Sequence, residues 1–321
     1  MRVLITGGAG YVGSTLAPLL LGAGHKVRVL DRLSYGGESL LGVWSHPDFE
    51  FAHGDVRDRE TLRQAVSECE AVVHLAAIVG DPACAREPET ARAVNLDASM
   101  SLIEESRRAG VQRFVFASTC SNYGKMKDPS QFVNEESELQ PVSLYAETKV
   151  AVEKCLLASA GDGWCPTPLR FATVFGVSPR MRFDLTVNEF TMEMITKKHL
   201  IVFGEQFWRP YVHVFDAARG IALILGAPAQ AVAGRVFNVG STDQNLQKQQ
   251  IVELIQPFAP DAKIEFVHKN EDPRDYRVSF DRIHGELGYN TTRSVVEGIV
   301  EVAKLVRTGA ISNLADSRYR N

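Results

Sequence analysis

Cysteine is sparse in this sequence and follows neither a metal-ligand nor a disulfide spacing. The 321 residues contain five cysteines, an odd number, and no two of them form a C-x-x-C pair. Neither a disulfide framework nor a zinc site is therefore indicated, and reduced thiols are the expectation. No apolar run reaches the length of a membrane span, so a membrane protein is not expected either.

An excess of basic charge is also lacking. Lys and Arg number 35 against 39 Asp and Glu, for a net charge of -4, which argues against a nucleic-acid-binding surface. The first predicted strand follows Met1 directly, and this predicts that there is no signal peptide. We therefore expect a cytoplasmic protein with no nucleic-acid or membrane partner. Its length suits one large α/β unit or two domains.

A glycine-rich segment follows the first predicted strand. The run "RVLITGG" leads into "AGYVGSTLAPLLLGAG", an amphipathic helix pattern in which Gly7, Gly10 and Gly13 have G-x-x-G-x-x-G spacing. Such glycines permit a tight turn and let the backbone approach a pyrophosphate at the helix N-terminus. Asp31 ends the next predicted strand, where its carboxylate would accept hydrogen bonds from the adenosine ribose and favour NAD over NADP.

Strands and helices continue to alternate beyond Asp31. The segments "FEFAH", "AVVHLAAIVG" and "VQRFVFAST" are predicted strands, and helices are predicted over 59–68 and 91–110. This alternation predicts parallel strands joined by right-handed crossovers. Asp55 follows the first of these strands and would contact the adenine edge, or alternatively cap the helix after it.

Tyr145 and Lys149 stand four residues apart in "SLYAETKVAVEKCLLASAG", a predicted helix. They therefore share one helix face. A nearby lysine ammonium favours the phenolate and so lowers a pKa that is ordinarily roughly 10. A tyrosine tuned in this way can exchange a proton with a substrate hydroxyl near neutral pH. The alternative is an ordinary Tyr and Lys on a helix, because this spacing also occurs by chance.

These segments together resemble the extended short-chain dehydrogenases, specifically the nucleotide-sugar epimerase/dehydratase group. The matching pieces are "TGGAGYVGS", Asp31, "GDVRD", "HLAA", Asn95, "STCSNYG", "YAETK" and "RPYVHVFD". The resemblance implies bound NAD and oxidation of a sugar carbon, usually C4. It implies that Tyr145 is the general base, that Lys149 positions the nicotinamide ribose and that Thr119 holds the sugar oxygen. The predicted cofactor site comprises Gly7, Gly10, Tyr11, Val12, Gly13, Asp31, Asp55, Val56, Leu75, Ala76, Ala77, Asn95, Tyr145 and Lys149.

The segment "STCSNYG" bears on which reaction is possible. Dehydratases of this group carry an adjacent Asp-Glu pair after the threonine, because elimination needs one group to take the C5 proton and another to protonate the departing hydroxyl. Cys120 and Ser121 occupy those two positions, which disfavours a 4,6-dehydratase. Cys120 is three residues before Tyr123, whereas relatives with a catalytic cysteine have it two before. A packing thiol is thus the default, and a catalytic thiol the alternative.

The second half of the chain supplies the candidates for substrate binding. Arg180 and Arg182 lie in the predicted loop "SPRMRFD", where guanidinium groups would suit phosphate oxygens; loop charge or an interdomain ion pair is the alternative. By resemblance, Arg209 binds the nucleotide diphosphate, Thr173 replaces an asparagine, and Arg274 clamps phosphate with Arg277 as a rival. The predicted substrate site comprises Ser121, Asn122, Thr173, Arg180, Arg182, Asn188, Arg209 and Arg274. No metal site is predicted.

The expected fold is α/β, with a doubly wound parallel-sheet Rossmann domain and a smaller α/β substrate domain. Residues 1–175 plus 206–242 would form the first, and 176–205 plus 243–321 the second. The leading hypothesis is an NAD-dependent nucleotide-sugar 4-epimerase similar to UDP-hexose 4-epimerases. The alternative is a 4-dehydrogenase or ketoreductase acting, for example, on a GDP-heptose or a deoxysugar; a non-catalytic NAD sensor is a third possibility. The resemblance also implies a homodimer through helices 91–109 and 145–160.

Overall fold

A seven-stranded sheet organises the larger part of the molecule. The computed structural model describes residues 1–125, 128, 131–161, 163–269 and 275–321. Every strand pair in the large sheet is parallel. In spatial order the strands are β10 (Phe237–Val239), β6 (Cys165–Phe171), β5 (Arg113–Thr119), β4 (Ala71–His74), β1 (Arg2–Thr6), β2 (Lys26–Asp31) and β3 (Phe49–His53). This confirms the predicted doubly wound α/β fold.

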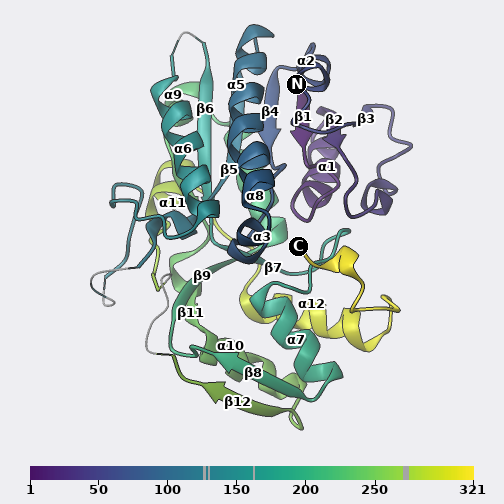
Figure 1. Cartoon of the computed structure of the whole chain (residues 1–321), viewed down its shortest axis with the longest axis vertical. Coiled ribbons are helices and arrows are strands. Elements are labelled where there is room, and N and C mark those ends of the chain that lie inside the picture. The colour runs from purple at the N-terminus through teal and green to yellow at the C-terminus, as the bar shows by residue number, and fades with distance from the viewer. Residues whose placement is uncertain (126–127, 129–130, 162, 270–274) are drawn as a thin grey trace.

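Helices cover both faces of this sheet, as the upper part of Figure 1 shows. One face is covered by α1 (Gly13–Gly22), α8 (Val214–Gly226), α9 (Ala229–Val232) and α11 (Asp281–Leu287). The opposite face is covered by α2 (Arg59–Val66), α5 (Ala98–Arg108) and α6 (Leu144–Ala158). The short helices α3 (Asp81–Arg86) and α4 (Pro88–Arg92) lie between β4 and α5 in the chain.

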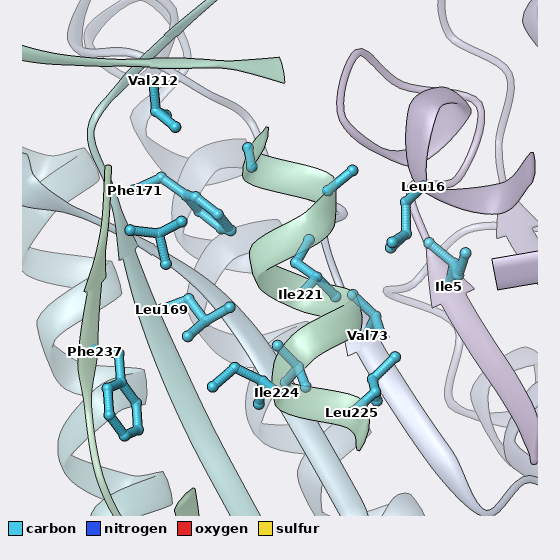
Figure 2. Packing of buried hydrophobic residues seen from close by; sticks show 14 of the residues in the cluster. Ile5, Leu16, Val73, Leu169, Phe171, Val212, Ile221, Ile224, Leu225 and Phe237 are labelled. Carbon is cyan, nitrogen blue, oxygen red and sulfur yellow. The ribbon is translucent and has the colours of Figure 1, made fainter. Parts of the chain in front are cut away.

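The alternation of side chains along β1 explains this two-layer covering. Val3 and Ile5 belong to the core that includes α1 and α8, whereas Leu4 between them packs with α2, α5 and α6. Successive strand residues point to opposite faces of the sheet, so the side chains of an uninterrupted apolar strand pack into the cores on both faces. Figure 2 shows Ile221 and Leu225 of α8 packed in the first of these cores.

A second, smaller core lies below the carboxyl ends of the large sheet in Figure 1. One three-stranded sheet joins β7 (Thr173–Phe175), β9 (Trp208–His213) and β11 (Asn245–Gln247), and β8 (His199–Phe203) pairs with β12 (Lys263–Val267). The helices around this core are α7 (Thr186–Thr196), α10 (Lys248–Ile255) and α12 (Val295–Arg307). The predicted domain boundaries stay a prediction, although β7 and β9 pair with one another outside the large sheet.

Three predicted segments differ from the observed ones. The strand predicted over 71–80 ends at His74, because the next residues turn along the cavity described below. The apolar and β-branched run "PLRFATVFG" predicts one continuous strand, but it breaks at Ala172, and its second half joins the small sheet as β7. The run "NLQKQQIVELIQPFAP" has a helical pattern that predicts a helix from Asn245, but α10 (Lys248–Ile255) begins three residues later. The Asn245 amide bonds both backbone groups of Val278 at 2.8 and 2.9 Å, and this holds β11 extended against β9.

All five cysteines are free thiols, and all but the half-buried Cys155 are buried. Within the described ranges, no helix combines the length and apolar character needed to cross a bilayer. In that same part of the chain, no group of His, Cys, Asp or Glu side chains is arranged to hold a metal ion.

Candidate active site

A cavity of about 730 Å³ opens where β1 and β4 end side by side. The order β4-β1-β2 places the topological switch point of the sheet between β1 and β4, which is where ligands bind in open α/β folds. Gly7 leaves β1 with a φ of +73°, and a Cβ there would lie 2.7 Å from the Ala76 nitrogen. A Cβ on Gly13 would lie 2.6 Å from the Gly7 oxygen. Only glycine therefore fits at these two positions.

The cavity lining fits a dinucleotide. Every residue of the predicted cofactor site lines it except Asn95. The glycine segment leads into the N-terminus of α1, where backbone N–H groups favour a pyrophosphate. The Asp31 carboxylate lies at the carboxyl end of β2, on the cavity wall. Together these features supply the two contacts that a bound adenosine diphosphate requires.

Asp31 is held in place by the backbone around it. Its oxygens accept hydrogen bonds from the Ala9 nitrogen at 3.0 Å and the Leu33 nitrogen at 2.8 Å. Burial raises the pKa of this carboxyl, and the two backbone donors act against that rise. Each oxygen keeps a further acceptor position, so the side chain can still bind ribose hydroxyls.

Asp55 does not cap α2. Asp58 does so, accepting the Glu60 nitrogen at 3.2 Å, so the capping alternative for Asp55 is wrong. Instead Asp55 accepts two hydrogen bonds from the Arg57 guanidinium, at 3.0 and 2.7 Å, and one from Arg32 at 3.3 Å. The hydrogen bond from Arg57 is the main cause that lowers the pKa of Asp55 to about 2. Asp55 lines the cavity, and its contact with adenine stays a prediction.

Asn95 supports the cavity wall from behind. It lies in a single π-helical turn, Ala93–Asp97, that interrupts the predicted helix 91–110. Its amide accepts the Ile78 nitrogen at 2.8 Å and donates to the Ile78 oxygen at 2.9 Å. With both amide groups engaged in this way and 1% of the residue exposed, Asn95 positions the segment after β4. Its role as a cofactor contact stays a prediction.

Tyr145, Lys149 and Thr119 all line the cavity. The Lys149 Nζ lies 5.8 Å from the centre of the Tyr145 ring, and its ammonium donates to the Ala117 oxygen at 2.8 Å. Thr119, the last residue of β5, accepts the Ser121 nitrogen at 3.1 Å and so starts the turn that follows. The one helix face shared by Tyr145 and Lys149 thus meets the end of β5.

The expected lowering of the Tyr145 pKa is not found. Burial raises the pKa of Tyr145 well above its usual value, Asp81 adds to the rise, and Arg182 opposes it. Burial also lowers the pKa of Lys149 to about 8. The expectation fails because burial of the phenol raises its pKa by more than the nearby cation lowers it. The Lys149 ammonium, moreover, donates its hydrogen bond to a backbone carbonyl.

The predicted substrate residues divide into two groups. Ser121, Thr173, Arg180, Arg182 and Arg209 line the cavity, whereas Asn122 and Asn188 do not. Arg274 lies outside the described residues. Its rival Arg277 is not part of the lining, and its guanidinium lies 5.0 Å from the Trp208 ring.

Asn122 and Asn188 are both fully buried and bond to the protein itself. Asn122 donates to Ser118 at 3.1 Å and to Glu153 at 2.8 Å. Asn188 accepts the Gly176 nitrogen at 2.9 Å and donates to the Arg182 oxygen at 2.9 Å. Because an asparagine amide can serve a backbone as readily as a ligand, the sequence could not separate these roles. Their roles as substrate contacts stay predictions.

Cys120 is a buried thiol outside the cavity lining. It is 1% exposed and donates to the Arg170 oxygen at 3.3 Å. Burial raises its pKa well above the ordinary thiol value. A thiolate is the reactive form of cysteine, so the geometry supports the packing role.

Sequence reasoning missed several cavity residues, among them Asp81, Tyr35 and Tyr276. Asp81 accepts the Ser143 hydroxyl at 2.6 Å, which ties it to the N-cap of α6 just before Tyr145. The Tyr276 hydroxyl lies 3.3 Å from the Ser121 Oγ. A carboxylate directly after a glycine beyond β4 was the available signal for Asp81. Tyr276 follows no comparable motif.

The fold and the cavity define a Rossmann-type enzyme of the extended short-chain dehydrogenase class. Residues 3–240 match the family described as "NAD dependent epimerase/dehydratase family". The chain therefore belongs to the NAD-dependent epimerase/dehydratase family and is an NAD-dependent enzyme of that type.

Similar proteins include both epimerases and dehydratases. The chain is 28% identical over 324 aligned positions to a UDP-glucose 4-epimerase of Corynebacterium glutamicum, covering 94% of each chain. It is 30% identical to a dTDP-glucose 4,6-dehydratase of Actinoplanes sp., covering 96% of this chain and 98% of the other. The solved UDP-glucose 4-epimerase of Thermotoga maritima with UDP-glucose is 26% identical, with a TM-score of 0.84 over 97% of this chain and 100% of that one.

A solved dehydratase is equally similar in fold. The dTDP-glucose 4,6-dehydratase DesIV of Streptomyces venezuelae, with NAD and TYD bound, is 27% identical, with a TM-score of 0.84 over 96% of this chain and 97% of that one. Overall similarity therefore does not separate the two activities, and the residues of the site have to.

Proposed function

We propose that the protein is a nucleotide-sugar 4-epimerase that oxidises its substrate transiently at C4. The observation that carries this proposal lies directly after Thr119. Cys120 is buried outside the cavity, and Ser121 has its hydroxyl near that of Tyr276. Neither side chain is a carboxylic acid, so the acid–base pair that elimination of water uses at these positions is missing.

The roles of the catalytic residues follow from their place in the cavity. When bound, NAD supplies a reversible two-electron oxidation of the sugar alcohol. Tyr145 takes the proton of the C4 hydroxyl during oxidation and returns a proton when the opposite face is reduced. Thr119 holds the same sugar oxygen from the end of β5. Tyr145 accepts this proton in its phenolate form. Burial opposes that form by raising the Tyr145 pKa, and the charge of Arg182, which lowers the pKa, favours it.

Two cations of the cavity lining suit a nucleotide diphosphate. Arg182 and Arg209 line the cavity together with Thr173. The guanidinium carbon of Arg209 lies 5.5 Å from the centre of the Tyr276 ring. The hydroxyl of the same tyrosine lies 3.3 Å from the Ser121 Oγ, so Arg209 and Ser121 lie on the same side of the cavity. Guanidinium groups bind phosphate oxygens well. We assign these residues to the diphosphate of the substrate. We also propose, from the family resemblance, that the enzyme is a homodimer.

The test is product analysis with the purified enzyme and a panel of UDP-, GDP-, dTDP- and CDP-sugars. A product of unchanged mass with inverted configuration at C4 is the expected result. Loss of two hydrogens would instead make the enzyme a 4-dehydrogenase, and loss of water would make it a dehydratase; either result overturns the proposal.

A Tyr145→Phe variant tests the assigned base. It should lose roughly 100- to 10,000-fold in kcat, the range typical of general acid–base catalysis, while still binding NAD. Tyr319→Phe removes a phenol outside the cavity lining and serves as the control. Full activity of Tyr145→Phe would remove Tyr145 from the mechanism.

A further inference from the structure

Two arginines in one cavity loop have different partners. Arg182 donates to both carboxylate oxygens of Asp184, at 3.0 and 2.6 Å. Arg180, two residues earlier, forms no ion pair within the part of the chain that the structure describes. Yet Arg180 is only 5% exposed. A buried guanidinium without an anion is costly, so this side chain calls for a negatively charged ligand.

The surroundings of the Arg180 guanidinium leave a donor available. Its carbon lies 3.9 Å from the centre of the Tyr35 ring, and its Nη2 donates to the Arg320 oxygen at 3.1 Å. Its Nε is buried and has no hydrogen-bond partner. Burial, together with the charge of Arg182, lowers the pKa of Arg180 to about 10. The residue lines the cavity and remains a cation at neutral pH.

The loop that carries Arg180 is fastened to the glycine segment and α1. The Arg180 nitrogen donates to the Ser14 hydroxyl at 3.3 Å, in the first turn of α1. The Ser178 hydroxyl donates to the Tyr11 oxygen at 2.6 Å and lies 3.1 Å from the Ser14 Oγ. These contacts place Arg180 beside the N-terminus of α1, where a pyrophosphate is expected.

Contacts separate the two arginines further. The Arg180 guanidinium lies over the ring of Tyr35, which follows β2 and Asp31 in the chain, whereas the Arg182 guanidinium is engaged by Asp184. Arg180 therefore belongs to the cofactor side of the cavity.

We propose that Arg180 binds a pyrophosphate oxygen of NAD, opposite the N-terminus of α1, and does not bind the nucleotide sugar. This inference goes beyond the proposed function, because it concerns cofactor binding and requires no particular sugar. It reassigns a residue that the sequence placed in the substrate site. Tyr35 supports the guanidinium plane, and Ser14 and Ser178 fix the loop.

The test is calorimetric titration of the full-length protein, freed of bound nucleotide, with NAD, ADP-ribose, NADP and UDP or dTDP. Arg180→Ala and Arg180→Gln should weaken NAD and ADP-ribose by on the order of 10- to 100-fold, the range for one charge-assisted hydrogen bond. Binding of UDP or dTDP should not change. Arg180→Lys keeps the charge, and its affinity for NAD and ADP-ribose should lie between those of the wild type and Arg180→Gln.

Arg182→Ala is the matched comparison, and it should weaken UDP or dTDP while leaving NAD unchanged. Three results overturn the proposal. Unchanged affinity for NAD and ADP-ribose with a lowered melting temperature would make Arg180 purely structural. Weaker binding of NADP alone would mean that Arg180 contacts a phosphate on the adenosine ribose. Weakening of UDP or dTDP alone would return it to the substrate site. If Arg180→Ala does not fold, Arg180→Lys and Arg180→Gln decide between these results. Failure of the epimerase proposal would appear only in product analysis and would leave these titrations interpretable.

Discussion

Glu153 of α6 and Arg170 of β6 form an ion pair in which both side chains are almost completely buried. The shortest N–O distance is 2.8 Å, and the side chains are 1% and 4% exposed. The Glu153 carboxylate also accepts from Ser118 and, at 2.8 Å, from Asn122. Arg170 donates to the Tyr123 hydroxyl at 3.0 Å. The pair thus ties the helix of Tyr145 to the strand end that carries Thr119.

Removing one member of this pair should destabilise the enzyme strongly. Glu153→Ala leaves a buried guanidinium without its anion, and a loss of roughly 3–5 kcal/mol in the free energy of unfolding is expected. Glu104→Ala, which breaks exposed ion pairs with Arg59 and Arg108, should cost less than about 1 kcal/mol. Denaturant unfolding of both variants gives the comparison.

The double substitution Glu153→Leu with Arg170→Met should recover much of that loss, because an apolar pair needs no charge compensation. It should not recover kcat, since the polar support of Ser118 and Asn122 beside the site is gone. Equal, mild effects of Glu153→Ala and Glu104→Ala would show that the buried network does not hold the site together.

Two glycines of the same loop should respond differently to alanine. At Gly13 the added Cβ would lie 2.6 Å from backbone atoms of Gly7 and Gly8, which cannot move aside easily. At Gly10 its one near neighbour is the Gly7 oxygen, at 3.1 Å. Gly13→Ala should therefore lower the melting temperature markedly. Gly10→Ala should fold and lose NAD affinity, because its Cβ blocks the backbone approach to the pyrophosphate. Unchanged NAD affinity in Gly10→Ala would place the pyrophosphate elsewhere.

Much of the fold and of the cofactor cavity followed from the sequence, since both rest on local patterns. The alternation of apolar strands with amphipathic helices fixes a parallel sheet, and the Gly7–Gly13 spacing with Asp31 marks the switch point. A strand end predicts where a residue lies but not its hydrogen-bond partners. Asn122 donates a hydrogen bond to Glu153, 31 positions later in the chain, and no local sequence spacing predicts such a contact.

Irregular backbone was the second source of error. The strand break at Ala172 and the π-helical turn at Asn95 both depend on packing between distant elements. Propensity gave no warning of the break, because β-branched and apolar residues continue through it. At the turn, Val94, Asn95 and Asp97 are weak helix formers, but such a small preference does not locate a π-helical turn. The pKa of Tyr145 was mispredicted for the same reason, since burial is a property of the folded whole.

Cys120 should be dispensable for catalysis. Its thiol is buried and its pKa is raised by that burial, so Cys120→Ala should keep kcat within about threefold and cost roughly 1 kcal/mol of stability through lost packing. Iodoacetamide at neutral pH should modify the half-buried Cys155 before the buried cysteines. Loss of activity in a well-folded Cys120→Ala variant would restore the thiol as a catalytic candidate.

Lys149 should make stability depend on pH in the alkaline range. Its pKa is lowered by burial from 10.5 to about 8 in the folded protein. Below pH 8 the amine is charged in both states, and the folded protein bears the full cost of the buried charge. Between pH 8 and 10.5 the unfolded chain binds more protons at this site, so the unfavourable contribution of Lys149 declines as pH rises.

The measurement is the melting temperature of the wild type and of Lys149→Met across that range. The melting temperature of the wild type should rise relative to that of Lys149→Met as pH rises from 8 to 10.5. Lys154→Met changes an exposed lysine on the same helix, and its melting temperature should differ from that of the wild type by a constant amount across this range. If the difference in melting temperature between the wild type and Lys149→Met were also constant, the pKa of Lys149 would not be lowered by folding. In the same range kcat/KM should fall, because Lys149 loses the charge with which it is proposed to position the nicotinamide ribose.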